Sequence, residues 1–417
     1  MKDRKFNSVI QTALALSLAM ITHLVGAKTT AITNATVYTV ASQGILEQAT
    51  VVIENDKIIA INPEQFKVDE TVDAKGRILT PGFIGSMNAL GLVEVGAVSL
   101  TRDSRDKKAD ITFDASLAFN PKSTLVAYTR KGGITSNIVT PAGGDGLFAG
   151  QSFAANLSGD FDSVISKQNA VLIYLGAISS GSRAQALQAL DHKLADLQEK
   201  LTTETDKKEK KVKPLKRNEQ ELKSLLAGQK PLLAYADRAT DLLALLKLKE
   251  KYSIDLVLVG ASDAVLIADK IATAKVPVIT SAIDNLPSSF DSLHGDLSNV
   301  AKLVKAGVKV ILAPKGDSHN LNQLRFDAGI AVANGLATTD AFSTLTANVA
   351  DVFKLNSGRI AIGKNADLVL WSGDPFELST KVDKMWIGGK EVSTHSRQDA
   401  LRNRYTSKTN MPKGYVK

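Results

Sequence analysis

Two kinds of hydrophobic pattern divide the chain. From Ala31 to Leu79, short alternating or β-branched runs such as Thr36 to Val40 are separated by turn residues, including Asn55-Asp56. This pattern predicts hairpin strands of a small sheet. A matching pair of runs lies near the other end, at Ala366 to Trp371 and Lys384 to Val392. We therefore expect one sheet assembled from both ends of the chain.

Between these ends, continuous apolar runs recur and most are followed by an amphipathic segment. Apolar runs that are buried on both faces and alternate with helices indicate a parallel sheet, and in this number a closed (β/α)8 barrel. The predicted strands are Val171 to Leu175, Pro231 to Ala236, Leu256 to Val259, Val276 to Thr280 and Val308 to Ala313.

The predicted barrel helices carry apolar residues at three- and four-residue spacing, as helices with one buried face do. They are Asp241 to Lys251, Asp263 to Thr273, Leu297 to Ala306 and Asn320 to Asn334. The segment from Ala184 to Leu226 differs because Lys, Glu and Gln dominate it. We expect a solvated helical excursion there, interrupted near Pro214.

The fold class expected is α/β, a (β/α)8 TIM-like barrel with a small β-sandwich domain. Residues 28–81 and 356–396 form the composite β-sandwich, residues 82–355 form the barrel, and residues 397–417 form a basic tail. The N-terminus precedes these parts. Lys2, Arg4 and Lys5 stand before the apolar run Val9 to Val25, and small residues follow up to Ala27.

This N-terminal arrangement is typical of a secretory signal peptide over residues 1–27, cleaved near Ala27. The expected location is therefore periplasmic or secreted, with no membrane association after cleavage. A retained membrane anchor is the alternative, although Gln11, Thr12 and Thr22 make the run weakly apolar for a span. The chain has no cysteine, which excludes disulfides and thiolate metal sites.

The net charge of +8 is spread along the chain, apart from Lys207 to Arg217 and the C-terminal tail. No motif of a nucleic-acid-binding module accompanies these runs, so we expect no nucleic-acid partner. Hydrophobic residues at 44% and charged residues at 23% are ordinary for a globular protein.

Several motifs resemble those of one family. Gly76 to Ile84 reads GRILTPGFI, Gly132 to Thr135 reads GGIT, and Gly150-Gln151 follows. The closing segment Gly358 to Val369, GRIAIGKNADLV, is the most specific. Together these motifs resemble the amidohydrolase superfamily, in particular its imidazolonepropionase-like and prolidase-like exported members. The resemblance implies the barrel fold, and hydrolysis of carbon-nitrogen bonds with one or two divalent metals.

The same resemblance shows where metal ligands are missing. The family ends its first barrel strand with Ile-Asp-x-His-x-His, in which residues two apart on a strand point the same way. Here Met87 and Ala89 flank Asn88 at those positions. A thioether and a methyl group cannot hold a hard or borderline divalent ion. The first strand therefore contributes no expected metal ligand.

Later strands repeat this loss. The fifth-strand motif is Tyr235-Ala236-Asp237-Arg238-Ala239, which keeps one carboxylate where the subgroup has His-x-His-Arg-Ala. Gly260 stands near the sixth-strand histidine position. The final aspartate, a general base in the family, maps to Lys315, Gly316 or Asp317. We also expect the Lys315 ammonium to pair with Asp237 across the barrel mouth, with solvation of Lys315 as the alternative.

Two of the five histidines, His294 and His319, fall in predicted loops at the correct end of the barrel. His192 and His395 are expected at the surface, and His23 lies in the signal. The candidate catalytic residues are Asp237, Lys315 and Asp317. The candidate pocket residues are Met87, Asn88, Ala89, Gln151, Tyr235, Arg238, Gly260, His294 and His319.

Three functions remain open. The first is a pseudoenzyme that binds a small molecule or supports an active relative, without a cofactor, as a homodimer or as a heterodimer with that relative. The second is a hydrolase of amide, lactam or peptide-like bonds whose reduced or relocated site of Asp237, His294, Asp317 and His319 would hold zinc or another divalent metal. The third is a solute-capturing module with an anion-accepting mouth lined by Arg238, Lys315 and Gln151.

Overall fold

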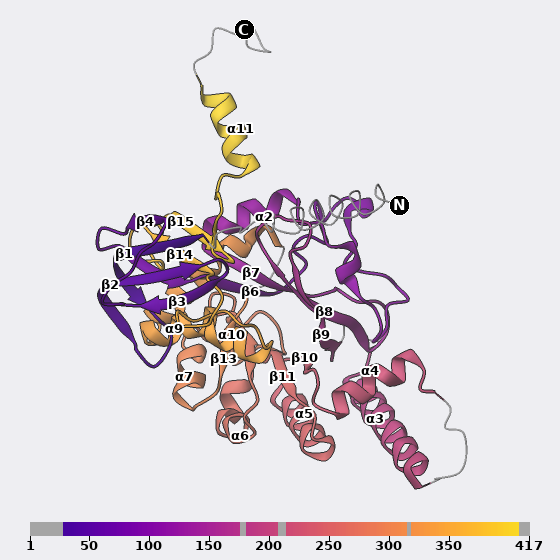
Figure 1. Cartoon of the computed structure of the whole chain (residues 1–417). Coiled ribbons are helices and arrows are strands. Elements are labelled where there is room, and N and C mark those ends of the chain that lie inside the picture. Colours follow the sequence, from indigo (N-terminus) through magenta and orange to yellow (C-terminus); the bar gives the residue numbers. More distant parts are fainter. Residues whose placement is uncertain (1–27, 176–180, 207–213, 315–317, 408–417) are drawn as a thin grey trace, which may run out of the picture.

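Two eight-stranded sheets organise the chain. The computed structural model describes residues 28–175, 181–206, 214–314 and 318–407 (Figure 1). Hydrogen bonds join the first sheet in the order β16-β15-β14-β5-β1-β2-β3, and β4 also pairs with β1. Its strands come from both ends of the chain, as the sequence predicts: β1 Thr29–Tyr38, β2 Ile45–Glu54, β3 Lys57–Ile61, β4 Glu70–Asp73, β5 Ile78–Pro81, β14 Leu368–Trp371, β15 Val382–Ile387 and β16 Lys390–Glu391.

Alternation of buried side chains gives this sheet a core of its own. Ile32, Val51 and Leu79 from the N-terminal strands pack with Leu368 and Trp386 from the C-terminal strands. Neighbouring strands therefore bury one shared face, as a sheet with one solvated face requires. Neither end of the chain completes this core without the other.

The second sheet is the barrel. Its strands pair in the order β13-β12-β11-β10-β9-β8-β7-β6. Helices α9 Thr338–Leu345 and α10 Ala347–Val352 contact both β6 and β13, the two ends of this order. The barrel is thus nearly closed. The strands are β6 Phe83–Asn88, β7 Ile134–Val139, β8 Phe148–Asn156, β9 Val164–Tyr174, β10 Leu232–Ala236, β11 Leu256–Gly260, β12 Val278–Thr280 and β13 Val310–Leu312.

One strand departs from the predicted parallel repeat. Strands β6 and β7 run parallel, and so do β9 to β13, whereas β8 is antiparallel to both of its neighbours. Residues 140–147 and 157–163, which connect β8 to those neighbours, contain no helix. Short connections reverse the chain direction, while a parallel crossover needs a longer segment. The barrel fold is confirmed with this exception.

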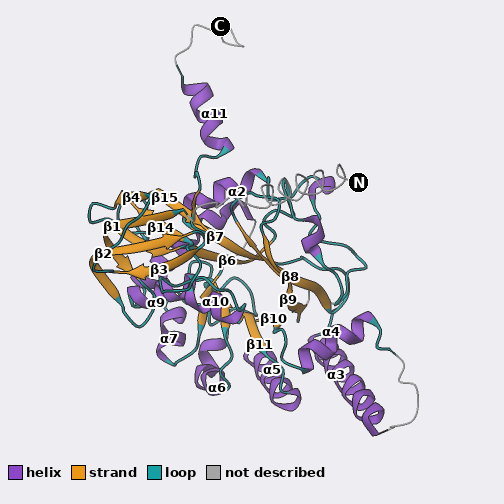
Figure 2. Ribbon diagram, in the orientation of Figure 1, coloured by secondary structure: helices purple, strands orange, loops and turns teal. Residues whose placement is uncertain are grey.

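Helices cover the outside of the barrel strands, and α5, α6 and α7 lie in a row along one side of the barrel (Figure 2). Besides α9 and α10, the described α-helices are α2 Thr124–Thr129, α3 Arg183–Asp206, α4 Arg217–Leu226, α5 Ala239–Tyr252, α6 Ala268–Thr273, α7 Asn299–Lys305, α8 Leu324–Ala333 and α11 Arg397–Thr406. A few short 3-10 segments accompany them.

The charged pair α3 and α4 is less solvated than its composition predicts. Leu190, Leu194 and Leu197 of α3 are buried in the main core. The Asp191 carboxylate also accepts hydrogen bonds from Lys251 at 2.7 Å and Tyr252 at 2.6 Å, which tie α3 to α5. The prediction of a solvated excursion was wrong on this face because leucines recur along it at helical spacing.

Helix α11 projects from the body of the molecule (Figure 1). Its base is held by Ser396 and Asp399, which form a reciprocal capping box. In the part of the chain that the structure describes, no helix combines the length and apolarity needed to cross a membrane. The predicted signal peptide lies outside the described residues.

Candidate functional site

A cavity of about 190 Å³ opens at the carboxyl ends of the barrel strands. Gly260 and Thr280 end their strands, and Tyr235 is the next-to-last residue of β10. The cavity therefore lies at the barrel mouth, where barrel enzymes place their active sites. It brings together three of the pocket residues expected from sequence. Its lining comprises Met87, Tyr235, Val259, Gly260, Ile279, Thr280, Ser281, Ala313 and Pro314.

The end of β6 does not follow regular strand alternation. Met87 has a φ of 58°, in the left-handed region that a residue with a Cβ rarely adopts. Its side chain lines the cavity. Asn88 instead forms a reciprocal amide pair with Asn137, at 2.8 and 2.9 Å, and Ala89 packs against a separate apolar cluster. The expectation that residues 87 and 89 point the same way is wrong here.

Tyr235 gives the cavity an aromatic wall. Its ring stacks on that of Tyr174, with centroids 4.7 Å apart and an interplanar angle of 16°. Burial raises the pKa of the Tyr235 hydroxyl far above its usual value, and the nearby Tyr174 and Asp237 act in the same direction. The hydroxyl therefore stays protonated at any physiological pH and can donate a hydrogen bond.

The Asp237 carboxylate lies next to Gly260, the glycine that stands at the expected histidine position. Its Oδ1 accepts hydrogen bonds from the Ser262 amide at 3.2 Å and the Ser262 hydroxyl at 2.8 Å. A Cβ added at Gly260 would lie 2.9 Å from that same oxygen, and the φ of Gly260 is +81°. A larger residue at 260 therefore strains the backbone and displaces the carboxylate.

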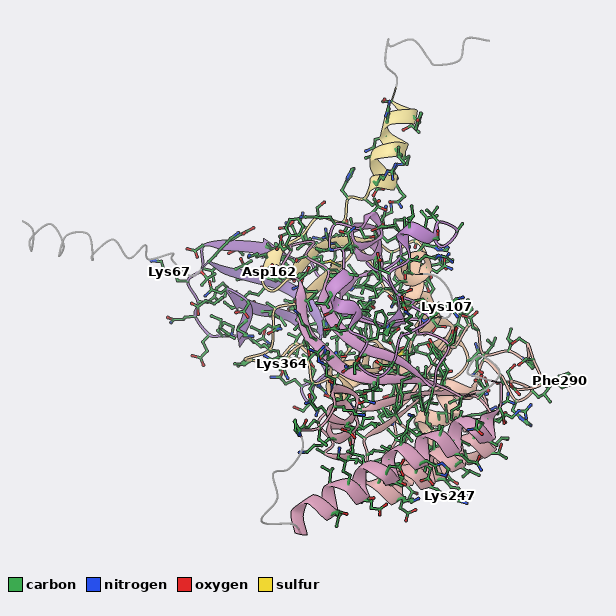
Figure 3. The ribbon with its side chains drawn as sticks, turned by 90° about the vertical axis from the view of Figure 1, so that its right-hand side faces the viewer. Lys67, Lys107, Asp162, Lys247, Phe290 and Lys364 are labelled. Atoms are coloured by element: carbon green, nitrogen blue, oxygen red, sulfur yellow. The ribbon has the colours of Figure 1, made fainter. Side chains whose placement is uncertain are left out.

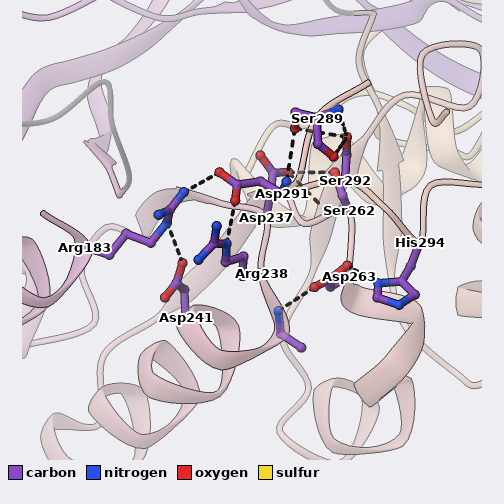
Figure 4. Close-up of polar contacts among 11 residues, drawn as sticks. Arg183, Asp237, Arg238, Asp241, Ser262, Asp263, Ser289, Asp291, Ser292 and His294 are labelled. Carbon is purple, nitrogen blue, oxygen red and sulfur yellow. Dashed lines mark hydrogen bonds and ion pairs between the residues drawn. The ribbon is translucent and has the colours of Figure 1, made fainter. Parts of the chain in front are cut away.

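The other charged candidates form ion pairs around the mouth (Figure 4). Arg238 Nε lies 2.5 Å from Asp291 Oδ1, and Arg183 contacts both Asp291 and Asp241. Asp291 thus neutralises Arg238, which weakens the predicted anion-accepting mouth.

His294 belongs to the same rim. Its Nδ1 lies 2.8 Å from Asp263 Oδ1, while half of its side chain remains exposed. His294 pairs with Asp263 whereas Asp237 accepts hydrogen bonds from Ser262, so the two candidate ligands bind different partners (Figure 4).

Two further candidates, Gln151 and His319, are not among the residues that line the cavity. Gln151 pairs along β8 with Val171, three residues before the end of β9, and its Oε1 accepts a hydrogen bond from Lys230 at 2.7 Å. It is therefore apart from the mouth cavity. His319 is exposed in the 3-10 segment Ser318–Gln323. Lys315 and Asp317 lie outside the described residues, and so does the expected Lys315 to Asp237 pair.

Asp327 of α8 is a residue near the mouth that the sequence analysis missed. Its Oδ1 accepts from the Ser281 hydroxyl at 3.1 Å and the amides of Ala282 and Ile283 at 2.9 and 2.6 Å. Burial raises its pKa to about 6. The signal was available in the sequence, because Asp327 stands on the apolar stripe of its helix between Leu324 and Ala331.

The described donors of this cavity do not fit a divalent metal. Among the described lining residues, the side-chain heteroatoms are a thioether, a phenol and two aliphatic hydroxyls, whereas zinc and harder ions bind imidazoles and carboxylates. Over the described ranges, no three His, Asp or Glu side chains come together as a metal site.

The nearly closed barrel, the site at its mouth and the second sheet built from both ends define an amidohydrolase-type fold. Residues 244–392 match the model of the amidohydrolase family. The amidohydrolase from Thermotoga maritima MSB8 is similar in structure, with a TM-score of 0.79 and 23% identity over 87% of this chain and 99% of that chain. The family model thus covers the later part of the barrel and the C-terminal strands, and the solved structure has the same fold.

Two further solved structures are similar at lower scores. A Xaa-Pro dipeptidase with bound methionine has a TM-score of 0.56 and 14% identity over 88% of this chain and all of its own, 100%. The A. niger ochratoxinase has a TM-score of 0.54 and 14% identity over 88% of this chain and 95% of its own. Such identities establish the fold alone. A search among curated proteins found no match.

Proposed function

We propose that this protein is an exported member of the amidohydrolase superfamily that has lost metal-dependent catalysis and binds a small molecule at its barrel mouth. The observation that carries this proposal is the cavity lining, where Met87 and Gly260 stand at expected histidine positions. The imidazolonepropionase-like and prolidase-like subgroup and the signal peptide, inferred from sequence motifs, belong to the same proposal.

The cavity also favours a particular kind of ligand. About 190 Å³ accommodates a small molecule, below the usual range for drug-sized pockets. Among the described residues, its lining carries no ionised side chain, and the Tyr235, Thr280 and Ser281 hydroxyls supply the polar contacts. A neutral compound with a carbonyl or hydroxyl group therefore matches it better than an ion.

Metal content tests the loss of catalysis. Protein purified without residues 1–27 is incubated with zinc or manganese, dialysed, and analysed by elemental mass spectrometry. We expect well under one ion per chain and no hydrolysis of acylated amino acids, lactams or dipeptides. One ion per chain that survives dialysis and disappears in Asp237→Asn would overturn the proposal.

Ligand binding is tested separately by thermal shift with a set of small neutral amides and alcohols. A ligand of the mouth should lose its effect in Met87→Trp, which fills the cavity, and keep it in Leu266→Trp on the exposed surface. An equal effect on both variants would place the ligand elsewhere.

A hydrolase with a relocated site is the second candidate, and the pairing of His294 with Asp263 favours it. A histidine oriented by a carboxylate is an arrangement used for general base catalysis. Activity lost in His294→Ala and retained in His192→Ala, an exposed histidine on α3, would select this candidate.

The proposed partner is a second copy of the chain or a metal-bearing relative encoded nearby. Light scattering of the purified chain, alone and mixed with that relative, tests this assembly. A monomer in both samples would remove the supporting-subunit role and leave ligand binding.

A further inference from the structure

A second cavity, of about 530 Å³, lies at the base of α11, away from the barrel mouth. It is formed where α8, the segment before β15 and the segment before α11 meet η3, Arg130–Gly132. We call it the basal furrow. The side chains that carry the argument are Lys131, Arg325, Lys381, His395, Asp399 and Arg402.

Positive charge in the basal furrow exceeds negative charge. Four of its described lining residues are cations, and Asp399 is the single carboxylate among them. Asp399 lies 2.7 Å from Lys131 and 3.7 Å from Arg402. Within the described residues, Lys381 has no ion-pair partner. Three positive charges therefore remain after Asp399 is paired.

Arg325 contributes to this excess of positive charge from a buried position, unlike the exposed side chains of Lys381 and Arg402. Its side chain is 5% exposed, with its guanidinium carbon 4.2 Å from the Phe326 ring centroid and 5.7 Å from that of Trp371. Its donors reach backbone carbonyls, including those of Glu377 and Thr380, each at 2.7 Å. No carboxylate within the described chain forms an ion pair with it.

An uncompensated buried charge has a physical cost. Removing a guanidinium from water is unfavourable unless hydrogen bonds and an opposite charge replace the lost solvation. Burial accordingly lowers the pKa of Arg325, and Asp374 only partly opposes that effect. Carbonyl groups satisfy donors but supply no net negative charge. An anion in the basal furrow would supply it.

We propose that the basal furrow binds the phosphate group of a free phosphate compound or of a phospholipid. The three excess charges match a dianion better than a single carboxylate. Arg and Lys together are the side chains that proteins use for phosphate. The exposed Lys381 and Arg402 can approach such a ligand, while the buried Arg325 adds to the positive electrostatic potential at the site. This proposal is independent of the barrel mouth and of any activity there.

Calorimetry with inorganic phosphate on the chain without residues 1–27, at low salt, tests the phosphate chemistry. The furrow variant is Lys381→Met with Arg402→Met. The matched control is Lys247→Met with Lys270→Met, which removes the same charge from α5 and α6. Figure 3 shows Lys247 at the opposite end of the molecule from α11. Circular dichroism checks that both variants remain folded.

We expect phosphate affinity to fall by about tenfold or more in the furrow variant, because the charge-assisted hydrogen bonds of both side chains to the phosphate are lost. The control variant should stay within about twofold. Equal losses in the two variants, or no phosphate binding by the unaltered chain at low salt, would refute the proposal.

Sedimentation with lipid vesicles separates the two sources of phosphate. Binding to phosphatidylglycerol vesicles but not to phosphatidylcholine vesicles, lost in the furrow variant alone, identifies a membrane headgroup. Phosphate binding without vesicle binding identifies a soluble phosphate compound. Vesicle binding that is unchanged in the furrow variant counts against the basal furrow as the site.

Discussion

Met87 shows how one residue decides whether a metal site can be built at this barrel mouth. Its left-handed backbone turns the chain so that residue 89 packs beside Leu92 and Phe153 rather than facing the cavity. Replacing the side chains at positions 87 and 89 therefore leaves the backbone geometry of this segment unchanged. Histidines placed at both positions would still point in different directions.

We predict that Met87→His with Ala89→His binds zinc no better than the unaltered chain. The second histidine also overpacks an apolar cluster, which costs roughly 1–3 kcal/mol of unfolding free energy. Zinc titration and urea unfolding measure the two effects. Tight zinc binding by this variant would show that both imidazoles reach one point.

Asp327 predicts a pH dependence of stability. Because burial raises its folded pKa to about 6, from 3.8, the folded state holds this proton more tightly than the unfolded state. Its contribution to the unfolding free energy is therefore greatest below about pH 4 and falls as the pH rises to 6, by about 3 kcal/mol at most. It levels off about one unit above the folded pKa, near pH 7.

Asp327→Asn isolates this effect, because the amide oxygen can accept the same hydrogen bonds but does not titrate. The buried Asp367 shifts in the same direction and remains present in both proteins. Urea unfolding at pH 4, 5, 6 and 7 should show the unaltered chain losing stability relative to Asp327→Asn. A constant difference across this range would contradict the prediction.

At the scale of elements, the α3 and α4 pair is a part of the core. We predict that Leu194→Ala lowers the unfolding free energy by about 2–5 kcal/mol, because Leu194 is fully buried. Lys193→Ala, one residue earlier on the exposed face, should change it by about 0.5 kcal/mol or less. Chemical denaturation compares the two. A small effect of Leu194→Ala would mean that the pair separates from the barrel.

Hydrophobic patterns predicted the barrel strands from Val171 onward because parallel, doubly covered strands are continuous apolar runs. They did not predict that β8 is antiparallel. All but the last of its nine residues are buried, so its sequence gives no sign of direction. The length of the connecting segments sets the direction of a strand. The absence of a helical pattern on either side of β8 was therefore the feature of the sequence that could have predicted its antiparallel direction.

The site was predictable to a similar extent. Motif positions brought Met87, Tyr235 and Gly260 to one cavity, since strand ends meet at the barrel mouth. Gln151 and Ala89 could not be placed, because a local reversal and a left-handed residue change which way a side chain faces. Long-range pairing, such as Arg238 with Asp291, left no periodic trace in the sequence.

At the scale of the whole molecule, the two sheets share side chains. Trp371 of the first sheet donates a hydrogen bond to the Thr80 hydroxyl at 2.9 Å, and its ring lies 5.3 Å from that of Phe83 in the barrel. Arg325 on α8 also holds carbonyls of the loop that follows β14. Loss of either sheet therefore removes core contacts from the other.

We predict a single unfolding transition for both sheets. Fluorescence of the chain's two tryptophans, Trp371 and Trp386, reports on the first sheet and its contact with the barrel, while far-ultraviolet circular dichroism follows all helices. The two signals should change at the same urea concentration. Separate midpoints would show that the sheets unfold independently.

The pairing of β14 with β5 also affects how the protein is made. Thr80 and Trp371, which meet in the finished fold, are 291 residues apart in the sequence. At about 5–20 residues per second, a ribosome takes roughly 15 to 60 s to supply the second after the first. Throughout that interval the β5 edge has no β14 to cover it, so the nascent chain cannot reach its final form before translation is nearly finished.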